Sequence, residues 1–170
     1  MINVTIDGVN VSVENGTTIL EAARKCGIDI PTLCFLKDIH EVGECRMCIV
    51  EVEGRRGFAT ACIQKCEDGM VINTNTQNII DARTVVLDLI LSNHHKECLT
   101  CTRSGNCELQ ALAQKYNVQN IEYTGEIKDF KIDDNSPAIV RDLNKCILYE
   151  MSFDYETLID ECVENIKTGG

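Results

Sequence analysis

Residues 34–62 read CFLKDIHEVGECRMCIVEVEGRRGFATAC, and the cysteines in this stretch decide the fold. They follow the spacing C-x10-C-x2-C-x13-C, at Cys34, Cys45, Cys48 and Cys62. A second set of ligands has the spacing H-x3-C-x2-C-x5-C, at His94, Cys98, Cys101 and Cys107. Thiolates select iron–sulfur clusters, zinc or copper(I) over harder ions. Two consecutive sets of four ligands therefore predict two metal clusters, in a protein that carries electrons.

Cysteine usage and charge narrow the class of protein. Eleven cysteines in 170 residues are typical of disulfide scaffolds or of cytosolic metal proteins. We expect the second class, in a reducing cytoplasm, because the count is odd and the chain does not begin like a signal peptide. A net charge of −11 without a Lys/Arg cluster argues against nucleic acid and anionic membranes as partners. The longest apolar stretch, 79–91, is too short to span a bilayer.

The first 75 residues predict an α+β unit, with one helix packed on a small mixed sheet. Residues 2–13 alternate in hydrophobicity on either side of Asp7-Gly8, which predicts a hairpin. Residues 29–48 show no period and suit a loop wrapped around a metal. Further strands are expected at 48–52, 58–62 and 70–73.

A helix over 19–26 is expected to follow the hairpin. Thr18 and Glu21 form a capping-box pattern at its start, and Gly27 is a typical helix stop.

Residues 76–130 predict a second, helical unit around the second ligand set. Apolar residues recur at helical spacing from Thr76 onward, and this helix is expected to deliver His94. A short helix after Cys107 has one apolar face, formed by Leu109, Leu112, Ala113 and Tyr116. Residues 131–170 are interpreted as a C-terminal tail, with an amphipathic helix expected over 155–166.

The first ligand set suits a [2Fe–2S] cluster, which four thiolates hold around two irons. Cys45 and Cys48 can bind the same iron from one turn of loop, while Cys34 and Cys62 arrive from outside it. Gly43 lets the backbone approach a sulfide closely. Zinc is the alternative, but zinc prefers two short C-x2-C pairs and only one pair here is close.

The second ligand set can hold either zinc or a [4Fe–4S] cluster. A neutral His94 in place of a thiolate makes the site less negative, which should raise its reduction potential. Gly105 gives the loop between Cys101 and Cys107 freedom to curve. His94 is preferred over His95 because of its position relative to the three cysteines, and His95 is interpreted as an ordinary surface or core side chain.

The other cysteines are not assigned as metal ligands, with Cys66, which is close to Cys62 in sequence, as the one alternative to that ligand. Cys26 is interpreted as a small buried residue of the first helix, Cys66 as a loop cysteine and Cys162 as core. The sequence contains no catalytic triad, phosphate-binding glycine loop or paired-carboxylate site. We therefore expect no catalytic residue and no binding site beyond the clusters.

Both motifs resemble those of a known family. The first comprises Pro31-Thr32-Leu33-Cys34, Gly43-Glu44-Cys45-Arg46-Met47-Cys48, Ala61-Cys62 and Asp68-Gly69-Met70-Val71-Ile72; the second comprises residues 94–101 and 105–110. In this order they are similar to the N-terminal iron–sulfur region shared by the complex I large iron–sulfur subunit, [FeFe]-hydrogenases, and related bifurcating hydrogenase and NADH-linked formate dehydrogenase subunits. The resemblance covers about residues 1–145. It implies a β-grasp, plant-type ferredoxin-like domain, a small helical His/Cys3 [4Fe–4S] domain, and iron–sulfur rather than zinc.

The chain departs from the family pattern after Asn144-Lys145-Cys146. The family continues with a Cys-x2-Cys-x2-Cys run, whereas Tyr149 and Ser152 stand at the next two cysteine positions. We expect the third cluster to be absent and Cys146 to be a stranded remnant.

The resemblance implies an electron-transfer subunit without catalytic turnover of its own. It would relay single electrons between a flavin-containing NAD(P)H dehydrogenase subunit and a further redox subunit, in a hetero-oligomer of the hydrogenase, formate dehydrogenase or transhydrogenase type, electron-bifurcating ones included. Two alternatives remain open. One is a zinc-stabilised structural or assembly module, and the other is a scaffold subunit whose clusters are electronically silent.

Overall fold

The computed structural model describes residues 1–136 and 139–147. The helix expected over 155–166, Cys162, Tyr149 and Ser152 lie outside the described residues. Among the residues that are described, no helix is both long and apolar enough to cross a membrane.

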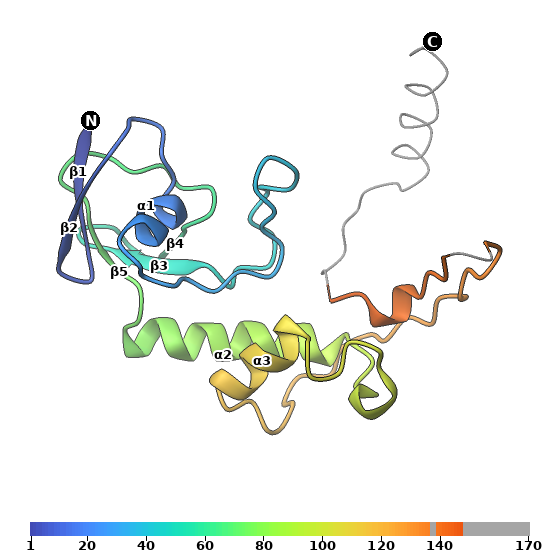
Figure 1. Ribbon diagram of the computed structural model, residues 1–170. Coiled ribbons are helices and arrows are strands. Elements are labelled where there is room, and N and C mark those ends of the chain that lie inside the picture. The colour runs from blue at the N-terminus through green and yellow to red at the C-terminus, as the bar shows by residue number, and fades with distance from the viewer. Residues whose placement is uncertain (137–138, 148–170) are drawn as a thin grey trace, which may run out of the picture.

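A five-stranded mixed sheet forms the first unit (Figure 1). Its strands, in chain order, are β1 (Ile2–Ile6), β2 (Val9–Val13), β3 (Ile49–Val52), β4 (Phe58–Thr60) and β5 (Val71–Asn73). Their order in space is β2-β1-β5-β3-β4. The β1–β5 pair is parallel, and the other three pairs are antiparallel. The α+β class is confirmed, and the later strands begin or end one or two residues inside the predicted ranges.

Local sequence signals set the hairpin and the first helix as predicted. Asp7 and Gly8 have φ angles of 46° and 82°, which a tight two-residue hairpin turn requires. Helix α1 (Ile19–Lys25) begins with a complete capping box. The Glu21 N–H donates to the Thr18 hydroxyl at 3.2 Å, and the Thr18 N–H donates to the Glu21 carboxylate at 3.2 Å. Gly27 follows the helix with a φ of 75°.

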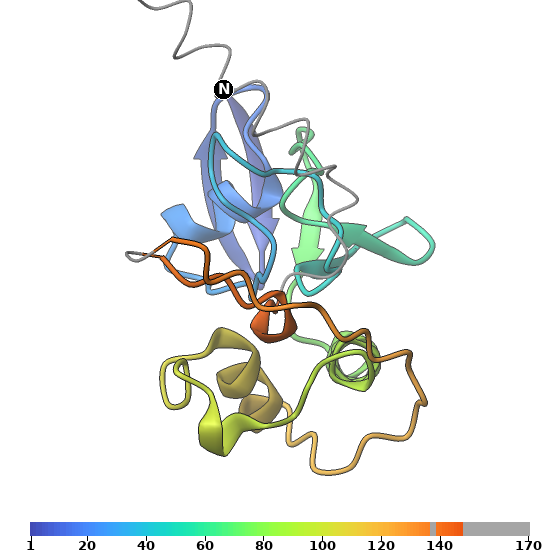
Figure 2. The ribbon, with the colours of Figure 1, turned by 90° about the vertical axis from the view of Figure 1, so that its right-hand side faces the viewer.

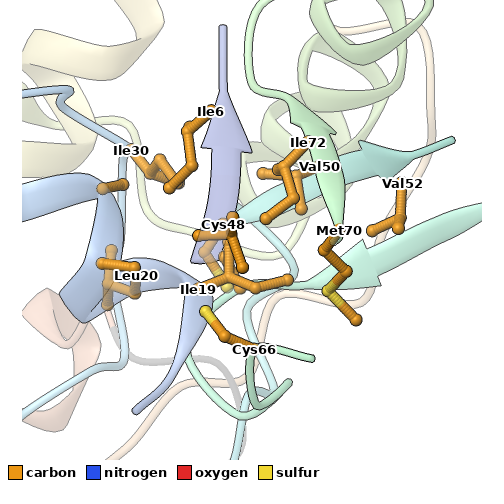
Figure 3. Close-up of a cluster of buried hydrophobic side chains, with 14 of the residues drawn as sticks. Ile6, Ile19, Leu20, Ile30, Cys48, Val50, Val52, Cys66, Met70 and Ile72 are labelled. Atoms are coloured by element: carbon orange, nitrogen blue, oxygen red, sulfur yellow. The ribbon is translucent and has the colours of Figure 1, made fainter. Parts of the chain in front are cut away.

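Helix α1 packs on the sheet, and buried apolar side chains between them form the first core (Figure 3). Cys66 lies in a loop, as interpreted, but its side chain is 3 % exposed and packs in this core. Its N–H donates to the Thr17 carbonyl at 2.9 Å, which fixes the segment beside the start of α1. The buried position expected for Cys26 is wrong, since Cys26 caps the end of α1 and is half-buried.

The second unit is helical and lies on one side of the sheet unit in both Figure 1 and Figure 2. It contains α2 (Gln77–Ser92), the 3-10 turn η1 (Cys98–Thr100), α3 (Glu108–Lys115) and the 3-10 turn η2 (Leu143–Lys145). Helix α2 ends before His94 and is capped by Asn93. The predicted helix therefore exists, but His94 is the first residue beyond its cap.

A second apolar core joins the two units. From the first unit it contains Leu33, Cys34, Cys45 and Met47, and from the helical unit it contains Leu87, Ile90 and Leu109. Cys107 and Ile147 pack against its edge. The loop of the first ligand set is therefore held by helices α2 and α3, rather than by its own sheet alone.

Truncation of Leu87 should destabilise this junction. Leu87 is fully buried, so Leu87→Ala removes packing from both units and should lower the free energy of unfolding by about 2–5 kcal/mol. Leu89→Ala is the matched control on the same helix, because Leu89 is 41 % exposed, and it should cost about 0.5 kcal/mol. Denaturant unfolding measures both values. Equal losses would show that the junction adds no stability.

Candidate metal centres

The first ligand set lies in the loop before β3 and at the end of β4. Cys34, Cys45 and Cys48 come from the loop, and Cys62 follows β4 across the antiparallel β3–β4 pair. All four side chains are buried, with exposed fractions between 1 % and 6 %. Buried thiols brought together from separate parts of a chain are suited to hold a soft metal centre.

The four thiols form two hydrogen-bonded pairs. The Cys48 and Cys62 sulfurs lie 3.3 Å apart, and the Cys45 N–H donates to the Cys34 sulfur at 3.4 Å. The Cys34–Cys45 side-chain hydrogen bond lowers the pKa of Cys45 to about 5 and raises the pKa of Cys34. The Cys48–Cys62 bond likewise lowers the pKa of Cys48 and raises that of Cys62. One thiol in each pair is therefore favoured as a thiolate, the form that binds metal.

The two pairs also act on each other, so the structure brings the whole first set together. The hydrogen bond with Cys48 and burial raise the pKa of Cys62 most, and the charges of Cys34 and Cys45 raise it further. Backbone N–H groups reach the Cys45 sulfur from Met47, Leu33 and Cys34. Such N–H donors around thiolates are the surroundings that iron–sulfur centres use to set their potential. The donor set fits a [2Fe–2S] cluster.

Three residues with left-handed backbone shape this loop. Asp38 has a φ of 63°, Gly43 a φ of 71° and Arg46 a φ of 58°. The Arg46 guanidinium donates to the Thr60 hydroxyl at 2.8 Å, which ties the loop to β4.

Substitution of Gly43 should strain the loop. A Cβ at this position would lie 3.1 Å from Thr60 Cγ2 and 3.2 Å from Ile63 Cδ1. Gly43→Ala should therefore cost more than the about 1–2 kcal/mol of the left-handed backbone alone. Gly57→Ala is the matched control, because Gly57 has a φ of 77° and nothing within 4 Å of its Cβ position. Denaturant unfolding of both variants tests this, and an equal cost would show that the neighbours yield freely.

The second ligand set surrounds a cavity of about 280 Å³ in the helical unit. Cys98 lies on η1, Cys101 caps that turn, and Cys107 is the N-cap of α3. His94 and all three cysteines line the cavity. At neither site do three His, Cys, Asp or Glu side chains of the described residues converge closely enough to hold a single metal ion. The structure thus places the second set around one space without drawing its side chains to one point.

Burial lowers the pKa of His94, with smaller contributions from the nearby His95 and Lys145, while the backbone of Cys146 acts in the opposite direction. The neutral imidazole is the ligating form, so burial favours the form of His94 that binds metal. The donors therefore fit a [4Fe–4S] cluster.

Sequence reasoning missed several residues near the two sites. Cys146, expected to be a remnant, lines the second cavity together with Lys145. His40 places its Nδ1 atom 2.8 Å from the Cys34 carbonyl. Arg83 is 2 % exposed and lies between the two units. The Lys145-Cys146 pair, which the chain shares with the family pattern, was a sequence signal for the second cavity. The signal for Arg83 was its position in the apolar stripe of α2, where a cation is unusual.

Two protein families match successive parts of the chain. Residues 1–77 match the 2Fe-2S iron-sulfur cluster binding domain. Residues 83–122 match the NADH-ubiquinone oxidoreductase-G iron-sulfur binding region, which is a 4Fe-4S family. These matches assign one [2Fe–2S] cluster and one [4Fe–4S] cluster to the chain, as the resemblance implied.

Individual relatives agree with the family matches. The chain is 44 % identical over 153 residues to NADP-reducing hydrogenase subunit HndD of Solidesulfovibrio fructosivorans, covering 87 % of this chain and 26 % of the relative. It is 37 % identical over 150 residues to the NADH-ubiquinone oxidoreductase 75 kDa subunit of Reclinomonas americana, covering 86 % and 21 % respectively. This chain thus spans about a quarter or less of the length of these relatives.

A solved structure has the same fold. It is the crystal structure of an NAD+-reducing [NiFe]-hydrogenase in the H2-reduced state, and it superposes with a TM-score of 0.79 at 29 % sequence identity. The match covers 86 % of this chain and 62 % of the hydrogenase chain. This chain therefore shares its fold with a chain of that hydrogenase over most of its length.

Proposed function

We propose that this chain is an electron-transfer subunit. It carries the tandem iron–sulfur region shared by the large iron–sulfur subunits of NADH-ubiquinone oxidoreductases and by NADP-reducing hydrogenase subunits. It relays single electrons between a flavin-containing NAD(P)H dehydrogenase subunit and a further redox subunit. The host complex is an NAD(P)H-linked oxidoreductase of the hydrogenase, formate dehydrogenase or transhydrogenase type. The supporting observation is the second apolar core, because it contains cysteines of both ligand sets, Cys34 and Cys45 with Cys107 at its edge.

We assign the ligands of each cluster from the two sets. The [2Fe–2S] cluster is held by Cys34, Cys45, Cys48 and Cys62. The [4Fe–4S] cluster is held by His94, Cys98, Cys101 and Cys107. Each bound cluster accepts and releases one electron at a time, and the chain sets its potential through ligand type, N–H donors and burial. The pairing of buried thiols at the first set supports the first assignment, and the shared cavity supports the second.

Residues 1–75 form a plant-type ferredoxin-like β-grasp domain in this proposal. The mixed sheet order β2-β1-β5-β3-β4, with a parallel central pair and one packed helix, supports it. Residues 76–130 form the His/Cys3 domain and residues 131–170 the tail. Thiolate ligands at both sites need a reducing compartment, and we place the protein in the cytoplasm.

Exposed apolar side chains beside each site support docking to two partners. Near the first set, Leu36, Ile39 and Val42 are 56 %, 82 % and 47 % exposed. Between two ligands of the second set, Leu99 is fully exposed. Apolar side chains left in solvent are common at protein–protein interfaces. We assign one partner subunit to each surface.

Rapid reduction in the native complex tests this role. The complex is purified anaerobically, mixed with NADH or NADPH, and followed by absorption and freeze-quench EPR. Relay function predicts that both clusters become reduced within the turnover time of the complex. A scaffold role predicts that dithionite reduces the clusters while the nicotinamide does not. Zinc without inorganic sulfide would exclude both roles.

A further inference from the structure

Arg83 is a buried cation at the junction of the two units. Its side chain is 2 % exposed, on the face of α2 that also buries Ile79 and Leu87. One turn further along this face, Leu87 packs in the core that contains Cys34 and Cys45. The guanidinium is therefore out of contact with solvent, on the same helix face as Leu87.

The hydrogen-bond partners of Arg83 are neutral. Its Nη2 donates to the Ile49 carbonyl at 2.8 Å, and its Nη1 donates to the Tyr116 hydroxyl at 3.0 Å. Its Nε is buried without a hydrogen-bond partner in the described residues. Across residues 1–136 and 139–147, no carboxylate forms an ion pair with it. A buried charge is costly unless an opposite charge compensates it, so this cation calls for a buried anion.

One of these hydrogen bonds places Arg83 close to the first ligand set. Ile49 directly follows Cys48 at the start of β3. Tyr116 is the C-cap of α3, and Cys107 is the N-cap of the same helix. The first hydrogen bond therefore fixes Arg83 beside the residue that follows Cys48. The second fixes it at the C-terminal end of α3, and Cys107 lies at the opposite end of that helix.

We propose that the positive charge of Arg83 compensates the negative charge of the [2Fe–2S] centre and raises the reduction potential of that centre. This proposal rests on the proposed function. Four thiolates and an oxidised [2Fe–2S] core carry a net charge of −2. One electron from the donor converts one Fe(III) to Fe(II) and makes the charge −3, with no proton or bond exchanged. A fixed cation in a low-dielectric site stabilises the more negative state more strongly. The anion that Arg83 lacks among the described side chains is thus the cluster itself.

The competing explanation is that Arg83 only clamps β3 to α3. Under that explanation its loss lowers stability and leaves the potential of a bound cluster unchanged. Redox titration separates the two because stability and potential are independent readouts.

The experiment compares Arg83→Gln, Arg83→Lys and Arg55→Gln in the full chain within its complex, by EPR-monitored redox titration. Arg55→Gln is the matched control, because it also removes one positive charge, from an exposed side chain paired with Glu67 at 2.7 Å. Arg83→Gln should lower the reduction equilibrium constant of the [2Fe–2S] centre about tenfold, which is 59 mV for one electron. Arg83→Lys keeps the charge and should stay within about threefold of the parent, as should Arg55→Gln.

Each outcome of the titration distinguishes an electrostatic role of Arg83 from a role as a clamp between β3 and α3. A loaded Arg83→Gln protein with the parental potential overturns the proposal, whatever its stability. If Arg83→Gln does not retain the cluster, Arg83→Lys decides, because lysine keeps the charge but lacks the guanidinium fork that joins the Ile49 carbonyl to the Tyr116 hydroxyl. A loaded Arg83→Lys protein then supports the charge, and loss of loading there too assigns Arg83 to the clamp. Absence of a [2Fe–2S] signal in the parent would instead refute the proposed function, and so the two failures are distinct.

Discussion

Cys62→Ala should abolish the [2Fe–2S] centre and leave the [4Fe–4S] centre in place. Cys62 is 1 % exposed and its sulfur lies 3.3 Å from that of Cys48. Its removal leaves three thiolates for a cluster that needs four ligands. We expect complete loss of the [2Fe–2S] EPR signal and of two irons per chain, measured after anaerobic purification.

Cys66→Ala is the control for this experiment. Cys66 is four residues away and equally buried, but burial raises the pKa of its thiol and no ligand thiol shapes it. This variant should keep the cluster while losing about 1 kcal/mol of stability. Cluster loss in Cys66→Ala with retention in Cys62→Ala would reassign the fourth ligand.

Cys101→Ala should remove the [4Fe–4S] centre and preserve the [2Fe–2S] signal. Cys101 lines the second cavity at the end of η1, and its loss leaves two cysteines and one histidine. Iron content should fall by four per chain, and the spectrum of the reduced [4Fe–4S] cluster should disappear.

Cys146→Ala supplies the contrast at the same cavity. Cys146 is exposed, yet it shares the cavity wall with the second ligand set. Under the assigned ligands this variant keeps the [4Fe–4S] spectrum, with a change in stability within about 0.5 kcal/mol. If Cys146→Ala loses the cluster and His94→Ala retains it, Cys146 rather than His94 is the fourth ligand.

His94→Cys should retain the [4Fe–4S] centre but lower its potential. A thiolate adds a negative charge that the neutral imidazole does not carry, and more negative ligand sets have lower potentials. Redox titration followed by EPR measures the shift. An unchanged potential would show that His94 does not bind the cluster.

Local patterns predicted the first unit well because their causes are local. The turn at Asp7-Gly8 and the capping box of Thr18 and Glu21 depend on residues within three positions of each other. The presence of two clusters was also predictable, since short cysteine spacings reflect the loop that must bend around a metal. One family match spans the first cysteine set and the other spans the second.

Contacts between distant segments were not readable from the sequence. Cys66 lies in a loop by sequence, but its burial depends on the start of α1 almost fifty residues earlier. Arg83 appeared as a charge interrupting an apolar stretch, and its partners Ile49 and Tyr116 lie more than thirty residues away on either side. Nothing in a single sequence predicts that two such units pack through the first cluster loop.

Iron and acid-labile sulfide, counted per chain after anaerobic purification, test the central claim most directly. The assigned clusters predict about six irons and about six sulfides per chain, the content of one [2Fe–2S] and one [4Fe–4S] cluster. EPR of the reduced protein should show two distinct signals. A folded chain that binds zinc and contains no acid-labile sulfide would contradict the account.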